Sequence, residues 1–213
     1  YHTPYRLSPL SFKVNGQEYF NERPISTQQS GFVFVSQMRS TMPDAIGGVL
    51  WFGTDDANMT VFTPVYCCTD KVPVCYTRVD GADYITFSWN SSFWIFNWVA
   101  NMVYPRYDLL IDDVRATQTE LETTFNEAQE GIESAASKLY SKDPAQAKAF
   151  LTNYTNMTAQ STLDTWKRLG EFLIVKYNDG VVKRMKDGKF ERNAIGQPAG
   201  VVRPGYPKEF LEE

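Results

Sequence analysis

Histidine is almost absent from this chain of 213 residues, since the one histidine is His2, beside the first residue. Catalytic triads and dyads that use histidine need an imidazole held rigidly, and chain ends usually fray. Cysteine is scarce too, with Cys67, Cys68 and Cys75 as the three thiols. The usual Cys/His zinc sites are therefore not expected. We predict neither a metal ion nor another cofactor.

Long apolar runs and an excess of positive charge are also missing. No stretch of about 18 apolar residues could span a bilayer. The 25 acidic residues outnumber the 21 basic ones, and the net charge is −4. Binding to nucleic acid of any sequence needs a positive surface, so we expect neither a nucleic-acid nor a membrane partner. A chain of this length can bury a core without a disulfide framework.

The first half of the chain has the patterns of antiparallel strands. Asn15-Gly16 between two short alternating segments predicts a hairpin within an extended lead-in over residues 1–30. Apolar and β-branched segments then predict a meander, and alternation up to Trp89 predicts a further strand. The middle segment of the meander is nearly all apolar, so we expect both its faces to be covered. The predicted meander segments are residues 32–39, 46–53 and 60–66.

The second half has helical periodicity. Aromatic residues between 84 and 104 predict a core cluster containing a helical turn or two, with a ligand platform as the alternative. Apolar residues spaced 4-3-4-3 predict a long helix over about 105–140, with Gln118 as the break in the stripe. Asp143 as N-cap and Pro144 at the first helical position predict a second helix to about residue 178. Residues 31–104 thus form a sheet with an aromatic core, 105–180 a helical hairpin and 181–213 an extended tail.

Two clusters carry functional chemistry but favour structural roles. Cys67, Cys68 and Cys75 have no histidine nearby, so a structural role is favoured over a nucleophile. A disulfide from Cys67 or Cys68 to Cys75 is an alternative if the protein is exported. The carboxylates Asp55 and Asp56 could bind calcium or serve acid–base chemistry, although a role in a turn is favoured.

Several segments occur in a characteristic order, and the most specific is a Trp-Phe-Gly-x-Asp-Asp segment followed by Pro-x-Tyr. These segments are residues 22–32, 35–39, 50–57, 62–66, 93–97, 166–170 and 176–180. Their order resembles the C-terminal part of the dipeptidase A/secernin family of cysteine peptidases. The resemblance implies an α+β fold, part of the αββα sandwich of N-terminal-nucleophile hydrolases, with strands over about 31–89 and helices over about 105–178. It also implies hydrolysis of dipeptides or short peptides by an N-terminal cysteine, whose own α-amino group is the base.

This chain departs from the family pattern at its first residue, because Tyr1 cannot act as that nucleophile. We therefore expect residues 1–213 to be one C-terminal portion of a larger peptidase domain, inactive alone, with the nucleophile upstream and the missing N-terminal half as a partner. A homo-oligomer through the helices is a further expectation. Export from a bacterial cell is favoured over the cytoplasm. The alternative function is a non-catalytic secernin-like module for oligomerisation or ligand binding.

Four residues are candidates for substrate binding, chosen from their chemistry rather than from a family motif. Arg39 could hold a substrate carboxylate, with a surface ion pair as the alternative. Trp51 could form a wall of the pocket, with a place in the core as the alternative. Asp55 or Asp56 could receive a substrate amino group. No catalytic residue is expected within the chain itself.

Overall fold

The computed structural model describes residues 11–20, 25–27, 29–206 and 208–212. The chain forms two compact units, Tyr1–Lys167 and Arg168–Glu213, and each is described by itself. The predicted lead-in over residues 1–30 lies partly outside the described residues. Antiparallel strands precede long helices in the chain, as the sequence predicts for the α+β class. No helix in the described ranges has the length and apolar character needed to cross a membrane.

The Asn15-Gly16 hairpin forms as the sequence predicts. Strands β1 (Ser11–Val14) and β2 (Gln17–Phe20) pair antiparallel across the turn. Asn15 and Gly16 have φ angles of 51° and 82°. Two positive φ angles define the tight turn that matches the twist of a hairpin, and asparagine followed by glycine adopts them readily.

The predicted meander is a three-stranded antiparallel sheet in the order β3-β4-β5. Its strands are β3 (Phe32–Met38), β4 (Gly48–Thr54) and β5 (Thr63–Tyr66), with the short helix α1 (Asp44–Gly47) before β4. Gly53 is required by packing, because a Cβ there would lie 2.5 Å from Oγ1 of Thr60. Thr60, in the segment between β4 and β5, therefore packs directly against Gly53 near the carboxyl end of β4.

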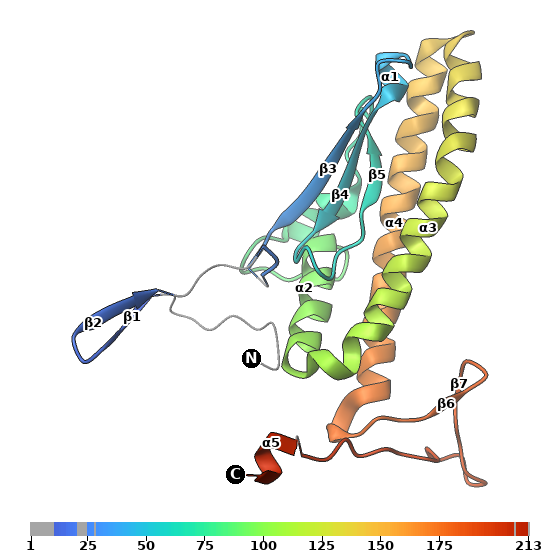
Figure 1. Ribbon diagram of the computed structural model, residues 1–213. Coiled ribbons are helices and arrows are strands. Elements are labelled where there is room, and N and C mark those ends of the chain that lie inside the picture. Colours follow the sequence, from blue (N-terminus) through green and yellow to red (C-terminus); the bar gives the residue numbers. More distant parts are fainter. Residues whose placement is uncertain (1–10, 21–24, 28, 207, 213) are drawn as a thin grey trace. The chain divides into compact units, whose positions relative to one another are not determined.

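The two faces of this sheet have different environments. In the register of β3 with β4, Val49 and Trp51 share a face, and Val49 is fully buried with Tyr66 of β5. Figure 1 shows the long helices along the sheet, and that face packs against them through Tyr154 and Ala136. The opposite face, here called the exposed sheet face, carries Phe32, Phe34, Met38, Leu50, Phe52 and Val65. Phe32, Phe34 and Met38 are 62%, 51% and 67% exposed. No residue of β4 itself is exposed: on this face Leu50 and Phe52 are half-buried, and Phe52 packs on Tyr76, so the exposed positions belong to β3. The prediction that β4 is covered on both faces is therefore confirmed in part.

The predicted strand ending at Trp89 is also wrong. Asp83 and Thr86 form an isolated bridge that closes a turn, and the Asp83 carboxylate accepts the Ile85 backbone N–H at 3.1 Å. Such side-chain-to-backbone bonds compete with strand pairing. Several aromatic residues near this turn are exposed rather than in the core, among them Tyr84, Phe87 and Trp89.

Three helices complete the first unit and its core. Helix α2 (Ser92–Val103) is longer than the predicted turn or two and stacks Phe96 on Trp166 at a centroid distance of 4.5 Å. A 3-10 turn (Tyr104–Arg106) leads into α3 (Tyr107–Tyr140), and α4 (Pro144–Tyr177) follows. The Asp143 carboxylate accepts the Ala145 N–H at 2.9 Å, which confirms the predicted N-cap.

The second unit begins within α4 and continues through short elements. After the 3-10 turn Asn178–Gly180, β6 (Met185–Lys186) and β7 (Lys189–Phe190) form a small hairpin, and α5 (Lys208–Glu212) follows. Isolated bridges join Val182 to Val202 and Arg192 to Pro198. Phe172 stacks on Phe190, with Lys176 over the Phe172 ring. This unit thus holds its residues 181–206 by a few local contacts.

Candidate functional site

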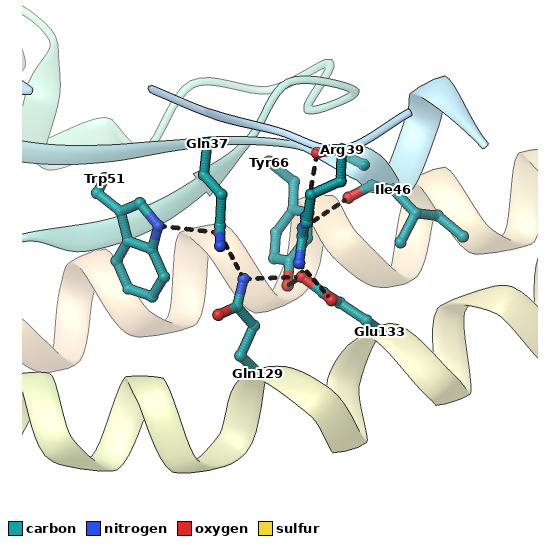
Figure 2. A network of polar contacts seen from close by, with 8 residues as sticks. Gln37, Arg39, Ile46, Trp51, Tyr66, Gln129 and Glu133 are labelled. Atoms are coloured by element: carbon teal, nitrogen blue, oxygen red, sulfur yellow. Dashed lines mark hydrogen bonds and ion pairs between the residues drawn. The ribbon is translucent and has the colours of Figure 1, made fainter. Parts of the chain in front are cut away.

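Arg39 lies at the end of β3 and points toward α3. Its guanidinium makes a two-pronged ion pair with Glu133, at 2.7 Å and 2.6 Å (Figure 2). It also donates to the carbonyl oxygens of Ile46 and Gly47, at 3.5 Å and 3.3 Å. The Arg39 and Glu133 side chains are 22% and 5% exposed. A pair with this geometry and little exposure is stronger than an ordinary surface ion pair.

Trp51 belongs to the same polar network, shown in Figure 2. Its indole N–H donates to Gln37 at 3.2 Å, and Gln37 accepts in turn from Gln129 at 2.8 Å. Gln129 and the Tyr66 hydroxyl both donate to Glu133. Burial first, and the Glu133 carboxylate second, raise the pKa of Tyr66 above its ordinary value. The network joins all three strands to α3.

These contacts describe what Arg39 and Trp51 do in this structure. Arg39 forms an ion pair, which is the alternative weighed for it, and Trp51 is half-buried beside the core cluster. Arg39 and Glu133 also line a cavity of about 380 Å³ with Asn126 and Ser137. Binding of a substrate carboxylate by Arg39, and a pocket wall at Trp51, stay predictions.

Asp55 and Asp56 lie at the other end of β4, directly after Thr54. Both residues are 1% exposed. Asp55, at a φ of 68°, accepts from the Asn97 side chain of α2 at 2.9 Å, and its N–H donates to Gly31. Asp56 accepts from the Ser26 hydroxyl and, at 2.7 Å, from the Asn58 N–H. The carboxylates are therefore buried and oriented, rather than solvated in a loop.

Each of these two carboxylates has one Oδ2 atom that is buried without a hydrogen-bond partner among the described residues. Burial is the main reason that the pKa of Asp55 rises to about 7, and the neighbouring Asp56 adds to the shift. The bond from Asn97 acts in the opposite direction. Asp55 can thus hold a proton near neutral pH, and a cationic group placed here would satisfy both unpaired oxygens. Within the described ranges, no three His, Cys, Asp or Glu side chains gather as a metal site.

The structure does not bring the four candidates into one place. Arg39 lies beside the first residue of β4, Gly48, whereas Asp55 follows the last residue, Thr54. Seven strand residues span about 20 Å at roughly 3.4 Å per residue. Arg39 and Trp51 form one cluster, and Asp55 and Asp56 form another.

The three cysteines are free thiols in three environments. Cys67 is exposed, Cys68 is partly buried and Cys75 is buried. Burial raises the pKa of Cys68 above its ordinary value and that of Cys75 to about 11. A thiol with a raised pKa is a poor nucleophile at neutral pH, so Cys68 and Cys75 have structural environments.

Sequence reasoning missed the two side chains that orient these clusters. Glu133 lies 94 residues from Arg39, and Asn97 lies 42 residues from Asp55. A weak signal was available for Asn97, which with Asn101 interrupts a mostly aromatic and apolar helix. Glu133 follows Gln129 by one helical turn, and both are polar residues that face the sheet.

Comparison with known protein families identifies one match. The profile of peptidase family C69 matches residues 2–120, which is more than half of the 213 residues. The match includes the meander, Arg39 and the Asp55-Asp56 corner. The chain therefore belongs to peptidase family C69, the dipeptidase A/secernin family that its segments resemble. Peptide hydrolysis is the class of chemistry that this membership supports. No curated protein matches the chain.

Proposed function

We propose that this chain is part of a cysteine peptidase that hydrolyses dipeptides or short peptides, with a nucleophile outside residues 1–213. The family match over residues 2–120 is the observation that carries the proposal. In the mechanism proposed, a cysteine thiolate adds to the peptide carbonyl carbon, and the C–N bond breaks as the leaving amine takes a proton from the protonated α-amino group. Water then hydrolyses the thioester and regenerates the thiol.

The thiol environments support a nucleophile elsewhere. Burial disfavours the thiolate at Cys68 and Cys75. Cys67 follows β5 and lies against Gly48, on which a Cβ would come within 3.1 Å of its sulfur. None of the three cysteines has a hydrogen-bonded base among the described residues, and nucleophilic cysteines need one or a positive environment.

The corner formed by Asp55 and Asp56 is the place proposed for a substrate amino group. Two buried carboxylates with unpaired oxygens would favour an ammonium group over a neutral one. Both side chains are covered here, so access requires Ser26 or the loop after β4 to move aside. Asn97 would keep Asp55 oriented.

The exposed sheet face is the surface proposed for packing with the part of the peptidase that carries the nucleophile. It presents Phe32, Phe34 and Met38 to solvent, whereas Val49 and Tyr66 on the other face are buried against the helices. Contiguous apolar patches of this kind mark protein interfaces. A second apolar layer on this face would give the two-sheet arrangement that the family resemblance implies.

The proposal is tested with the full-length protein and its triple variant Cys67→Ala, Cys68→Ala, Cys75→Ala. Hydrolysis of a dipeptide panel is followed by liquid chromatography before and after treatment with iodoacetamide. We expect both proteins to cleave dipeptides at similar rates and both to lose activity on alkylation. If the triple variant is folded but inactive, each cysteine is replaced singly. Loss of activity in one folded single variant would then assign the nucleophile to the cysteine replaced. Absence of hydrolysis by the unmodified protein would favour a non-catalytic family member.

A further inference from the structure

A cleft of about 620 Å³ opens where β3 begins, beside the segment before α2. This volume is typical of small-molecule sites. None of the four candidate residues lines it. The lining residues come from β3, from the 3-10 turns Val74–Tyr76 and Val79–Gly81 with their flanks, and from the start of α2, and include Phe32, Tyr76, Arg78, Asp83, Tyr84 and Trp94.

Aromatic rings form the walls of the cleft and are held by their neighbours. Trp94 donates its indole N–H to the carbonyl oxygens of Asp83 and Thr86, at 3.0 Å and 2.8 Å. Tyr84 meets Phe93 edge to face at 6.0 Å, and Phe93 meets Trp94 at 5.4 Å. Flat apolar groups bind well against walls of this kind, because ring pairs add to the free energy of apolar burial.

One ion pair lies on the lining of this aromatic cleft. Arg78 contacts Asp83 at 3.1 Å, and their side chains are 77% and 35% exposed. Hydrogen bonds from Ile85 and Thr86 hold the pKa of Asp83 below its ordinary value. A pair this exposed contributes little free energy. The Arg78 guanidinium can therefore exchange Asp83 for the carboxylate of a ligand.

The cleft adjoins both features used in the proposed function. Gly31 lines it and accepts the N–H of Asp55 at 2.9 Å. Phe32 lines it and stacks on Phe52 of the exposed sheet face at 6.0 Å. A ligand here would therefore lie between the carboxylate corner and the surface proposed for the nucleophile-bearing part.

We propose that this cleft selects dipeptides with an aromatic or large apolar side chain, which packs against Tyr84 and Trp94 while Arg78 binds the terminal carboxylate. The inference rests on the proposed function and names its preferred substrates. Loss of a charged hydrogen bond in such a site lowers affinity by about tenfold or more. A substrate without the carboxylate would not be affected by loss of Arg78.

The test compares kcat/KM of the full-length protein for a phenylalanine dipeptide, its C-terminal amide and an alanine dipeptide. We expect Arg78→Ala to lower kcat/KM for the free dipeptides at least tenfold and leave the amide within about twofold. Tyr84→Ala should lower the preference for phenylalanine over alanine by about fivefold. Arg115 is an exposed arginine of α3, and Arg115→Ala is the matched control. It should change neither the ratio of kcat/KM for the free dipeptide to that for the amide nor the preference for phenylalanine over alanine.

Direct binding separates failure of this inference from failure of the proposed function. Calorimetry uses a phenylalanine dipeptide analogue in which a methylene group replaces the peptide carbonyl. Dipeptide hydrolysis that neither Arg78→Ala nor Tyr84→Ala alters would overturn the cleft assignment and leave the peptidase standing. Binding of the analogue that depends on Arg78, without any hydrolysis, would support the cleft and overturn the peptidase. If the analogue does not bind and the variants change no kcat/KM ratio, the proposed role of the cleft is overturned.

Discussion

At the scale of single residues, Asp55 predicts how stability depends on pH. Its pKa is about 7 in the folded protein against 3.8 for an ordinary aspartate. Since the raised pKa means that the folded state binds the proton more tightly, its contribution is complete below about pH 4 and is lost as the pH rises to 7. Asp55→Asn removes the charge and can still accept from Asn97. We expect it to raise the free energy of unfolding at pH 8 by on the order of a few kcal/mol.

Thermal unfolding from pH 4 to pH 8 measures this effect. The melting temperature of Asp55→Asn relative to the unmodified protein should rise with pH and level off above pH 7. Asp187→Asn is the matched control, since Asp187 is exposed and also has a positive φ. Its melting temperature should equal that of the unmodified protein from pH 4 to pH 8. A difference between Asp55→Asn and the unmodified protein that does not change with pH would contradict the assignment.

At the scale of elements, the ion pair between Arg39 and Glu133 joins β3 to α3. Glu133→Gln leaves the guanidinium partly buried without its charge partner, so we expect a loss of about 3 kcal/mol in the free energy of unfolding. In a cycle with Arg39→Met, the double variant should be more stable than the sum of the single losses by about 2 kcal/mol. Urea denaturation measures all four proteins. Glu130→Gln, exposed on the same helix, should lie within about 0.5 kcal/mol of the unmodified protein.

Local signals predicted most of these elements, whereas pairing across the chain needed the structure. Asn15-Gly16 and Asp143-Pro144 specify their turn and helix start through backbone geometry and one side-chain bond. The sequence also placed Asp55 in a turn after a strand. Its burial could not be predicted locally, because the side chain that contacts it, Asn97, comes from α2. Periodicity gives the face on which a residue lies and not the partner that it meets. Alternation near Trp89 misled because the Asp83 carboxylate bonds to the backbone and closes a turn there.

At the scale of the whole molecule, the exposed sheet face predicts how these residues associate. Phe34→Glu places a charge on that face, and Val35→Glu places one on the opposite face of the same strand. Phe34 and Val35 are 51% and 55% exposed, so the pair is matched. In the full-length protein, we expect Phe34→Glu to lower the melting temperature and abolish dipeptide hydrolysis, because it disrupts the proposed packing. Val35→Glu should retain most of both. Equal effects of the two variants would show that this face has no special role.

The two outer strands of the meander differ in whether their backbone can pair with a further strand. On β5, Pro64 has no N–H to offer, the Tyr66 N–H donates to Thr155 of α4, and the Phe62 N–H just before the strand donates to Glu122 of α3. Prolines and covering helices close an edge to further strands. On β3, seven residues from Phe32 to Met38 form the opposite edge with β4 as their described partner. A further strand, whether from another part of the proposed peptidase or from a misfolded neighbour, would therefore add beside β3, so we expect protection of that edge to limit aggregation.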